Sequence, residues 1–449
     1  MSAKEKSVAI LGAGLVGSLL ATYLLKYGYK VTIYERRPDM RKDVISAGRS
    51  INLALSDRGW RGLAGVGLSE TVKKVAIPMH GRMIHNADSS INFQPYGKEG
   101  QAIYSVSRGG LNCLLMDEAE KRGAVIHYNE RCTNVDLNTN TAQFENQLSG
   151  KKSDVNADLV VGSDGAFSAA RLSLMFTERY NYSQQYLEHG YKELTIPANA
   201  DGTHRIEKNA LHIWPRGSFM LIALPNLDGS FTCTLFLPFE GKQSFQSLDT
   251  NERVTSFFKE TFPDAVTLMP TLEEDFFNNP TGSLVTVKCF PWTWGGKGML
   301  IGDAAHAVVP FYGQGMNCGF EDCADLDMLI NKYDHHWNQI LPEYEQLRKP
   351  SGDAIADLAV ANFFEMRDLV AHPDFLLRKK IEARFSNKYP GKWIPLYTMV
   401  TFSDHIPYHV AKTEGKRQEA IMDQVMRTPG IESKWDSEEV EKLILDRLG

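Results

Sequence analysis

Residues 7–35 read SVAILGAGLVGSLLATYLLKYGYKVTIYE, a pattern that predicts a strand, a glycine-rich turn, a helix, a second strand and an acid. We expect the strands at Val8–Leu11 and Lys30–Tyr34, with the helix running through Leu25. This order is typical of the first βαβ unit of a dinucleotide-binding domain, and it is far more specific than three spaced glycines alone.

Each small residue of the turn has a separate physical reason. Gly12 permits the sharp turn, Gly14 leaves the backbone open to a pyrophosphate, and Gly17 lets the helix lie close to the sheet. The helix N-terminus offers N–H groups to the phosphates, and Glu35 can accept hydrogen bonds from a ribose. A secretory signal also begins with an apolar run, but no small-residue cleavage site follows this one.

The composition indicates an ordinary globular protein of several domains. The chain has 449 residues, of which 43% are hydrophobic and 23% charged, with a net charge of −6. This balance disfavours a nucleic-acid surface. Since no charge-free run of 18 apolar residues follows the first motif, we also expect no membrane span.

The six cysteines are scattered, with no C-x-x-C pair and no histidine at metal-ligand spacing near them. They are Cys113, Cys132, Cys233, Cys289, Cys318 and Cys323. This usage predicts reduced thiols in a cytosolic protein, and no metal site.

Two later segments repeat the pattern of a buried strand that ends in an acid. ADLVVGSDGAFSAAR (157–171) places Asp164 after a strand, and GMLIGDAAHAVVPFYGQGMN (298–317) places Asp303 after another. Ligands of open α/β sheets collect at the carboxyl ends of such strands. Asp303 can accept from a ribityl hydroxyl, and a helix that begins at Gly315 can face an electron-rich ring edge.

Other patterns predict the remaining elements. Ile77–Phe93 alternates like a hairpin with a turn at residues 86–90, and Leu53–Gly67 looks helical. Tyr104–Gly123 predicts a strand, a turn and a helix, and Gln185–Val287 predicts an antiparallel sheet with one helix. The last third of the chain, from Leu341, is mainly helical.

Four polar residues have two interpretations. Arg37 and Arg82 are either surface charges or ligand contacts, and Asn362 is either a satisfied core amide or a ligand contact. His306 invites a catalytic role, although a histidine packed in its turn is the commoner case.

The three motifs GAGLVG…E, GSDG and IGDAAHAVVPFYGQGMN, in this order, resemble those of the single-component FAD-dependent aromatic hydroxylases. A narrower resemblance, to the branch of that family that hydroxylates L-kynurenine, extends from about residue 8 to about residue 410. It is carried by GRSINLALS, YSQQYLEHGYKELTIP, LHIWPRGSFMLIALPN, FTCTLFLPFE, VPFYGQGMN, DAIADLAVANFFEMRD and IPLYTMVTFS.

Together, the patterns and the resemblance imply an α/β fold in three parts. A Rossmann-like FAD-binding domain (1–76, 101–180, 295–335) is expected to interleave with a mixed or antiparallel β-sheet substrate domain (77–100, 181–294). A C-terminal helical region (336–449) is expected to close the pocket.

The resemblance also implies site residues. For the substrate, Arg82 and Tyr96 match positions that hold the carboxylate, and Asn362 and Tyr397 match further contacts. Gln314 is expected as a polar guide in an apolar lining of Phe311, Phe236, Leu224 and Pro310, with no catalytic side chain required. The expected FAD contacts are Gly12, Gly14, Val16, Gly17, Glu35, Arg36, Arg37, Ala54, Arg108, Cys132, Asp164, Ala169, Asp303, Gly315, Met316 and Asn317.

The reaction implied by the resemblance consumes NADPH and O2 and proceeds through a C4a-hydroperoxyflavin. No second G-x-G-x-x-G follows a strand, so we expect NADPH to visit without a Rossmann domain of its own. Eukaryotic members carry a hydrophobic C-terminal anchor that this sequence lacks, so a cytoplasmic, bacterial-type enzyme is expected. A homodimer is compatible with the sequence, which does not determine the oligomeric state.

Three alternatives remain open at this point. A flavoenzyme of the same fold could hydroxylate another aromatic acid or halogenate an indole, and a flavin-binding protein without turnover would share the motifs. A plain NAD-dependent dehydrogenase is weaker still, because it would leave the segment around Asp303 without a role.

Overall fold

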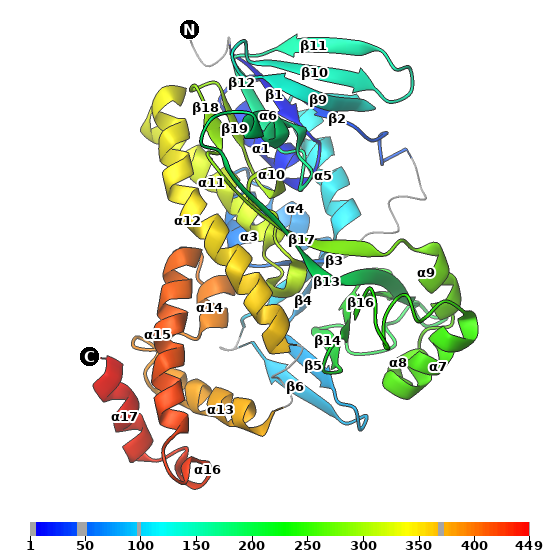
Figure 1. Cartoon of the computed structure of the whole chain (residues 1–449), viewed down its shortest axis with the longest axis vertical. Helices are drawn as coiled ribbons and strands as arrows, with labels where there is room; N and C mark the ends of the chain where they lie inside the picture. The colour runs from blue at the N-terminus through cyan, green and yellow to red at the C-terminus, as the bar shows by residue number, and fades with distance from the viewer. Residues whose placement is uncertain (1–5, 43–51, 97–99, 367–371, 449) are drawn as a thin grey trace.

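The computed structural model describes residues 6–42, 52–96, 100–366 and 372–448 (Figure 1). Its organising element is a six-stranded sheet in which every neighbouring pair is parallel except β18–β19. In spatial order the sheet contains β18 (Thr293–Trp294), β19 (Gly298–Leu300), β12 (Leu159–Gly162), β1 (Ser7–Leu11), β2 (Lys30–Glu35) and β8 (Val125–Tyr128). The parallel pairing brings the carboxyl ends of five neighbouring strands, β19, β12, β1, β2 and β8, to one edge.

Several helices accompany this sheet, some packed on its strands and others on the smaller sheets or on one another. They are α1 (Leu15–Lys26), α3 (Asp57–Ala64), α4 (Ser69–Lys73), α5 (Arg108–Lys121), α6 (Ala169–Met175), α10 (Asp303–His306), a 3-10 turn, η2 (Pro310–Tyr312), and α11 (Gly315–Lys332). Strands β1 and β12 are buried almost throughout, as strands covered on both faces are. Helix α1 packs against both α5 and α11, so the predicted first βαβ unit forms the centre of the core.

A seven-stranded sheet forms the other body of the molecule, at the lower right of Figure 1. It contains β17 (Gly282–Phe290), β13 (Asn181–Ile196), β16 (Phe231–Pro238), β15 (Met220–Pro225), β14 (Ala210–Pro215), β5 (Gly81–His85) and β6 (Ile91–Pro95). Helices α7 (Asn251–Thr261), α8 (Pro263–Val266) and α9 (Leu272–Asn278) add apolar side chains to the core of this body. The long strand β13 runs between the two bodies (Figure 1).

Two three-stranded sheets complete the β structure. One contains β3 (Asn52–Leu55), β7 (Ile103–Ser107) and β4 (Ala76–Met79), and the other β11 (Lys152–Asn156), β10 (Thr141–Asn146) and β9 (Glu130–Asp136).

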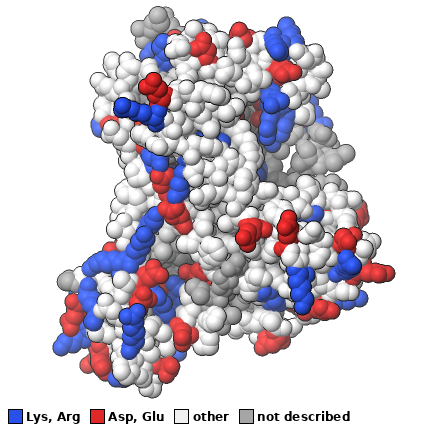
Figure 2. Space-filling model, in the orientation of Figure 1, with Lys and Arg blue, Asp and Glu red and all other residues white. Residues whose placement is uncertain are grey.

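The C-terminal region is helical, as predicted. It contains α12 (Trp337–Phe364), α13 (Pro373–Lys388), α14 (Leu396–Thr401), α15 (Tyr408–Met426), α16 (Ile431–Lys434) and α17 (Glu438–Leu448). Helix α12 lies along α11 and α15 and so joins the sheets to the last helices (Figure 1). Figure 2 shows acidic and basic side chains mixed on this face, with many of them over these last helices.

The predicted α/β class is confirmed, with three local corrections. The helix expected over Leu53–Gly67 begins only at Asp57, because Asn52–Leu55 pairs with β7 as a strand. The hairpin expected over Ile77–Phe93 begins at Gly81, since β4 pairs with β7 rather than with β5. The turn expected within Tyr104–Gly123 is absent, because α5 begins at Arg108 directly after β7 ends at Ser107.

Two further points concern the described part of the chain only. None of its helices combines the length and the apolarity that a membrane crossing demands. The first residues of the GRSINLALS stretch, Gly48–Ile51, lie outside the described ranges.

Candidate active site

The glycine turn after β1 has the three features that its sequence predicts. Gly12 has a φ of 102°, in the left-handed region that favours glycine. A Cβ atom on Gly17 would lie 2.2 Å from the carbonyl oxygen of Gly12, so only glycine permits this approach of α1. A Cβ atom on Gly14, by contrast, would meet no atom within 4 Å. The backbone therefore borders open space where α1 begins, with no acidic side chain in its first turn.

Glu35 ends the neighbouring strand and ties it to this turn. Its Oε2 accepts a hydrogen bond from the Ala13 N–H (2.9 Å), and its Oε1 accepts from Nε of Arg37 (2.8 Å). Burial raises the pKa of Glu35, but the hydrogen bonds and charge of Arg37 outweigh burial and leave the pKa below its usual value. The carboxylate is thus charged, while Arg36 and the side chain of Arg37 are exposed beside it.

Asp164 follows the strand on the other side of β1. Its Oδ2 accepts from the backbone N–H of Ala169 (2.7 Å), the first residue of α6, so Asp164 caps that helix. Its Oδ1 is buried without a partner among the described residues, and burial raises the pKa of this carboxyl. Cys132, on β9, lies close enough for Asp164 to contribute to its raised pKa of about 12, although burial is the main cause.

Arg108 approaches the same turn from α5. Four residues further along this helix, Asn112 donates from Nδ2 to the carbonyl oxygen of Ala13 (3.1 Å). Residues four apart share a helix face, so Arg108, which is exposed, lies on the face of α5 that meets the glycine turn. The Oδ1 of Asn112 is buried and, like Asp164 Oδ1, has no partner among the described residues.

The third motif lies at the same edge of the six-stranded sheet. Asp303, after β19, is exposed as the first residue of α10, and a Cβ on Gly302 would lie 3.0 Å from Val16 at the start of α1. Helix α11 begins nearby at Gly315, and a Cβ on Gly319 of that helix would lie 2.5 Å from Val16. The starts of α1, α10 and α11 therefore converge on one place.

Asn317 fixes the first turn of α11. Its Nδ2 donates to the carbonyl oxygens of Ala54 (2.8 Å) and Gly313 (2.7 Å), and its Oδ1 accepts from the Ser56 N–H (2.9 Å). These bonds use up the side-chain amide. A role of Asn317 or the buried Met316 in cofactor binding would accordingly rest on the backbone N–H groups of this turn.

Arg82 lies in an aromatic cluster on the neighbouring sheet. Its guanidinium carbon is 4.6 Å from the ring centroid of Tyr397 and 5.6 Å from that of Tyr96, and these two rings stack 5.4 Å apart. Nε of Arg82 and the hydroxyl of Tyr96 are buried, and neither makes a well-formed hydrogen bond with a described residue. Burial lowers the pKa of Arg82, but Tyr397, Tyr96 and Glu365 outweigh it and raise the pKa, so the cation is kept.

The aromatic cluster extends to Phe311 and Asn362. Tyr312 stacks on Tyr397 with 5.7 Å between centroids, and its neighbour Phe311 packs 4.8 Å from Phe236. Asn362, buried on α12, donates from Nδ2 to the carbonyl oxygen of Phe311 (2.7 Å). Leu224 packs in the small core that holds Tyr96, whereas Pro310 is exposed.

Gln314 joins this cluster to the start of α11. It is buried as the residue before Gly315, and its Oε1 accepts from the hydroxyl of Tyr408 (2.8 Å) and from that of Ser56 (3.4 Å). The two hydroxyls fix the orientation of the amide.

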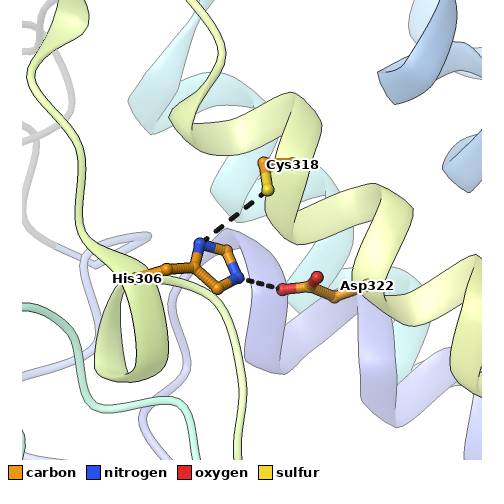
Figure 3. Close-up of side chains that lie close together, drawn as sticks. All are labelled: His306, Cys318 and Asp322. Atoms are coloured by element: carbon orange, nitrogen blue, oxygen red, sulfur yellow. Dashed lines mark hydrogen bonds and ion pairs between the residues drawn. The ribbon is translucent and has the colours of Figure 1, made fainter. Parts of the chain in front are cut away.

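His306 is a buried structural histidine in this arrangement (Figure 3). Its Nε2 lies 2.6 Å from Asp322 Oδ2, and its Nδ1 lies 3.8 Å from the Cys318 sulfur. The three side chains come together as metal ligands do, but Arg348 already donates to both Asp322 (2.7 Å) and the Cys318 sulfur (3.4 Å). A guanidinium in that place neutralises the carboxylate, and we assign no metal ion there.

Three residues near the site were not foreseen from the sequence. Tyr312 lies inside the VPFYGQGMN motif and could have been found as a neighbour of Phe311. Asn112 and Tyr408 sit on helices whose apolar periodicity carries no sign of their hydrogen bonds.

Comparison with known proteins agrees with this geometry. The family model described as "FAD binding domain" matches residues 5–359. Among solved structures, the tetrameric form of 2-methyl-3-hydroxypyridine-5-carboxylic acid oxygenase superposes with a TM-score of 0.66 at 20% identity, covering 85% of this chain and 96% of that one. The tetracycline destructase Tet(51) gives 0.61 at 17% identity, covering 89% and 98%. The family model and the fold thus define a protein with an FAD binding domain.

Curated relatives narrow this class. Kynurenine 3-monooxygenase of Flavobacterium johnsoniae is 53% identical over 441 residues, which cover 98% of each chain. The enzyme of the same name from Myxococcus xanthus is 48% identical (99% of this chain, 96% of the relative), and that from Dictyostelium discoideum 45% (99% and 97%). The chain belongs to the kynurenine 3-monooxygenase family.

The residues present fit FAD. The open space at Gly14, the unbonded buried oxygens of Asp164 and Asn112, and the converging helix starts are the partners that a pyrophosphate and a polyhydroxyl chain need.

Proposed function

We propose that this chain is a monooxygenase that uses NADPH, O2 and FAD to hydroxylate L-kynurenine to 3-hydroxy-L-kynurenine. The observation that carries the proposal is the half-buried Arg82, whose guanidinium lies against the rings of Tyr96 and Tyr397 and whose buried Nε is unbonded among described residues. A cation in this state favours a ligand carboxylate. L-Kynurenine offers that carboxylate together with an aromatic ring.

Different side chains would bind different parts of the substrate. Arg82 and the Tyr96 hydroxyl would hold the carboxylate, since burial keeps the pKa of Tyr96 well above its usual value and the hydroxyl remains a donor. The aromatic cluster that contains Phe311 and Tyr397 would border the aryl ring, with Asn362 and Gln314 as polar contacts.

FAD, once reduced by NADPH, supplies the activated oxygen, of which one atom enters the ring and the other leaves as water. The amine of the substrate makes the ortho carbon electron-rich, so no protein base is required. The chain has to orient the ring and exclude water, because oxygen activated in the presence of water is lost as hydrogen peroxide. The sequence holds no second dinucleotide motif, which supports a transient visit by NADPH.

The division into domains is proposed on the sheets that carry these residues. Arg82 belongs to the seven-stranded sheet, the cofactor-facing turns belong to the six-stranded sheet, and Tyr397 and Asn362 belong to the C-terminal helices. All six cysteines are free, which supports a reducing compartment such as the cytoplasm.

The test is NADPH oxidation by the purified yellow protein with and without L-kynurenine, with the mass of the product as second readout. Stimulated oxidation and a product heavier by one oxygen atom are expected. Stimulation that yields only hydrogen peroxide would make L-kynurenine an effector. No stimulation would favour a related hydroxylase or halogenase with another aromatic acid, or a flavin-binding protein without turnover.

A further inference from the structure

Arg58 is a fully buried arginine, with 0% of its side chain exposed, on the first turn of α3. An arginine is rarely buried completely unless all its donors are paired. The hydrogen-bond partners of Arg58 therefore indicate its structural role.

Most of these partners belong to one segment of the C-terminal region. Nε of Arg58 donates to the carbonyl oxygen of Val400 (2.8 Å), and Nη2 donates to those of Met399 (3.1 Å), Ser403 (3.2 Å) and Ile406 (2.5 Å). The last carbonyl groups of a helix have no partner within it and carry its negative dipole end. Arg58 thus binds the carboxyl end of α14, the helix that bears Tyr397.

The remaining contacts of Arg58 connect it to α11, the helix that begins at the proposed cofactor site. Nη1 donates to Glu321 Oε1 on α11 (2.5 Å), and the guanidinium carbon lies 3.9 Å from the ring centroid of Tyr408. The hydroxyl of Tyr408 in turn donates to Gln314. One side chain from the beginning of the sequence consequently joins α11, α14 and the orientation of Gln314.

We propose that Arg58 is a positioning residue for the hydroxylation: it sets Tyr397 and Gln314 relative to the N-terminal end of α11. The statement rests on the proposed function for its consequence, although not for its geometry. Only arginine suits the place, because lysine keeps the charge for Glu321 but lacks the planar fork that binds several carbonyls at once. A small misplacement of the substrate contacts lowers both binding and the share of oxygen that reaches the ring.

The experiment compares three variants of the FAD-loaded full chain. Arg58→Lys is expected to retain FAD, to raise KM for L-kynurenine roughly tenfold with a smaller change in kcat, and to raise the hydrogen peroxide formed per NADPH. Tyr408→Phe keeps the ring beneath Arg58 but removes the shorter of the two hydrogen bonds that orient Gln314, and should raise the peroxide ratio alone.

Arg216→Lys is the matched control. Arg216 also donates to backbone carbonyl oxygens, those of Thr261 (2.6 Å) and His85 (2.9 Å), but makes no recorded contact with α14, α15 or Gln314 among the described residues. Its KM and peroxide ratio should stay within about twofold of the wild type.

A readout without substrate separates this proposal from the function itself. Hydrogen exchange of the amides at residues 396–406 should accelerate in Arg58→Lys and stay unchanged in Arg216→Lys. If wild-type protein ignores L-kynurenine, the proposed function fails, and the exchange data still test the positioning of α14. Unchanged exchange in Arg58→Lys, or a wild-type KM and peroxide ratio with a lower melting temperature only, would overturn the proposal.

Discussion

Arg82 packs against aromatic rings, whereas a buried arginine side chain usually pairs with a carboxylate. Among the described residues it forms no ion pair, although Glu365 helps to raise its pKa, and its guanidinium lies over the rings of Tyr397 and Tyr96. Cation–π contacts replace only part of the hydration that a buried guanidinium loses. The site therefore holds a charge that a bound carboxylate would complete.

This charge can be tested by substitution. Arg82→Lys should raise KM for L-kynurenine by roughly ten- to a hundredfold, because the bidentate fork is lost while a charge remains. Tyr96→Phe, which removes a single hydroxyl, should raise it less. Steady-state kinetics would show both, and equal KM values for Arg82→Lys and wild type would contradict the assigned role.

His306 and Asp322 allow a pH prediction. Burial opposes the charge on His306, but Asp322 and Cys318 outweigh it and hold the pKa of His306 well above its ordinary value. Burial likewise opposes the charge on Asp322, but His306 and Arg348 lower its pKa to about 2. Because the folded pKa of His306 is raised, its contribution to stability is complete below the unfolded pKa near 6.5 and fades as the pH rises toward the folded pKa.

We expect Asp322→Asn to lower the free energy of unfolding by about 3–5 kcal/mol at pH 6, since it leaves His306 without its carboxylate and removes one of the three carboxylates that pair with Arg348. The loss should shrink between pH 6 and pH 9, where the unfolded histidine is neutral, and should not vanish, because Arg348 stays charged. Urea unfolding of both proteins across this range provides the measurement. A penalty that does not change with pH would show that His306 is neutral in the folded protein.

At the scale of elements, the β1–α1 turn separates folding from cofactor binding. Gly14→Ala adds a methyl group to open space, so it should leave the melting temperature of the FAD-free protein nearly unchanged and weaken FAD binding. Gly17→Ala forces the methyl group against the Gly12 carbonyl and should destabilise the FAD-free protein by about 1–3 kcal/mol. Thermal melting and FAD fluorescence titration distinguish the two; equal melting temperatures would refute the packing role of Gly17.

Elements whose cause is local could be predicted from the sequence. The glycine turn and the acids that end β12 and β19 follow from backbone chemistry within a few residues. Strand β3 was missed because four residues, NLAL, fit a helix face as well as a strand, and only pairing with β7 decides. Arg58 was missed for a related reason, since its carbonyl partners lie more than 340 positions away in the sequence.

Across the whole molecule, exposed and buried ion pairs differ in how much they stabilise the contacts between sheets and helices. Asp357 on α12 pairs with Lys288 of β17 and Lys412 of α15, and its side chain is 44% exposed. Water screens such pairs, so Asp357→Asn should cost less than about 1 kcal/mol, far below the cost of Asp322→Asn. Urea unfolding at neutral pH compares the two variants. If Asp357→Asn lowered the free energy of unfolding as much as Asp322→Asn, the exposed ion pairs of Asp357 would be a main contact between the sheets and the C-terminal helices.

The hydrogen bonds between Arg58 and residues 399–406 also impose an order on folding during synthesis. A ribosome delivers the glycine turn and α3 long before the segment that Arg58 binds. The strands of the cofactor edge can pair in that interval, but Tyr397 and Tyr408 cannot reach their places until α14 and the start of α15 have been made. A chain that still lacks this segment also lacks the arrangement that would direct oxygen onto a substrate.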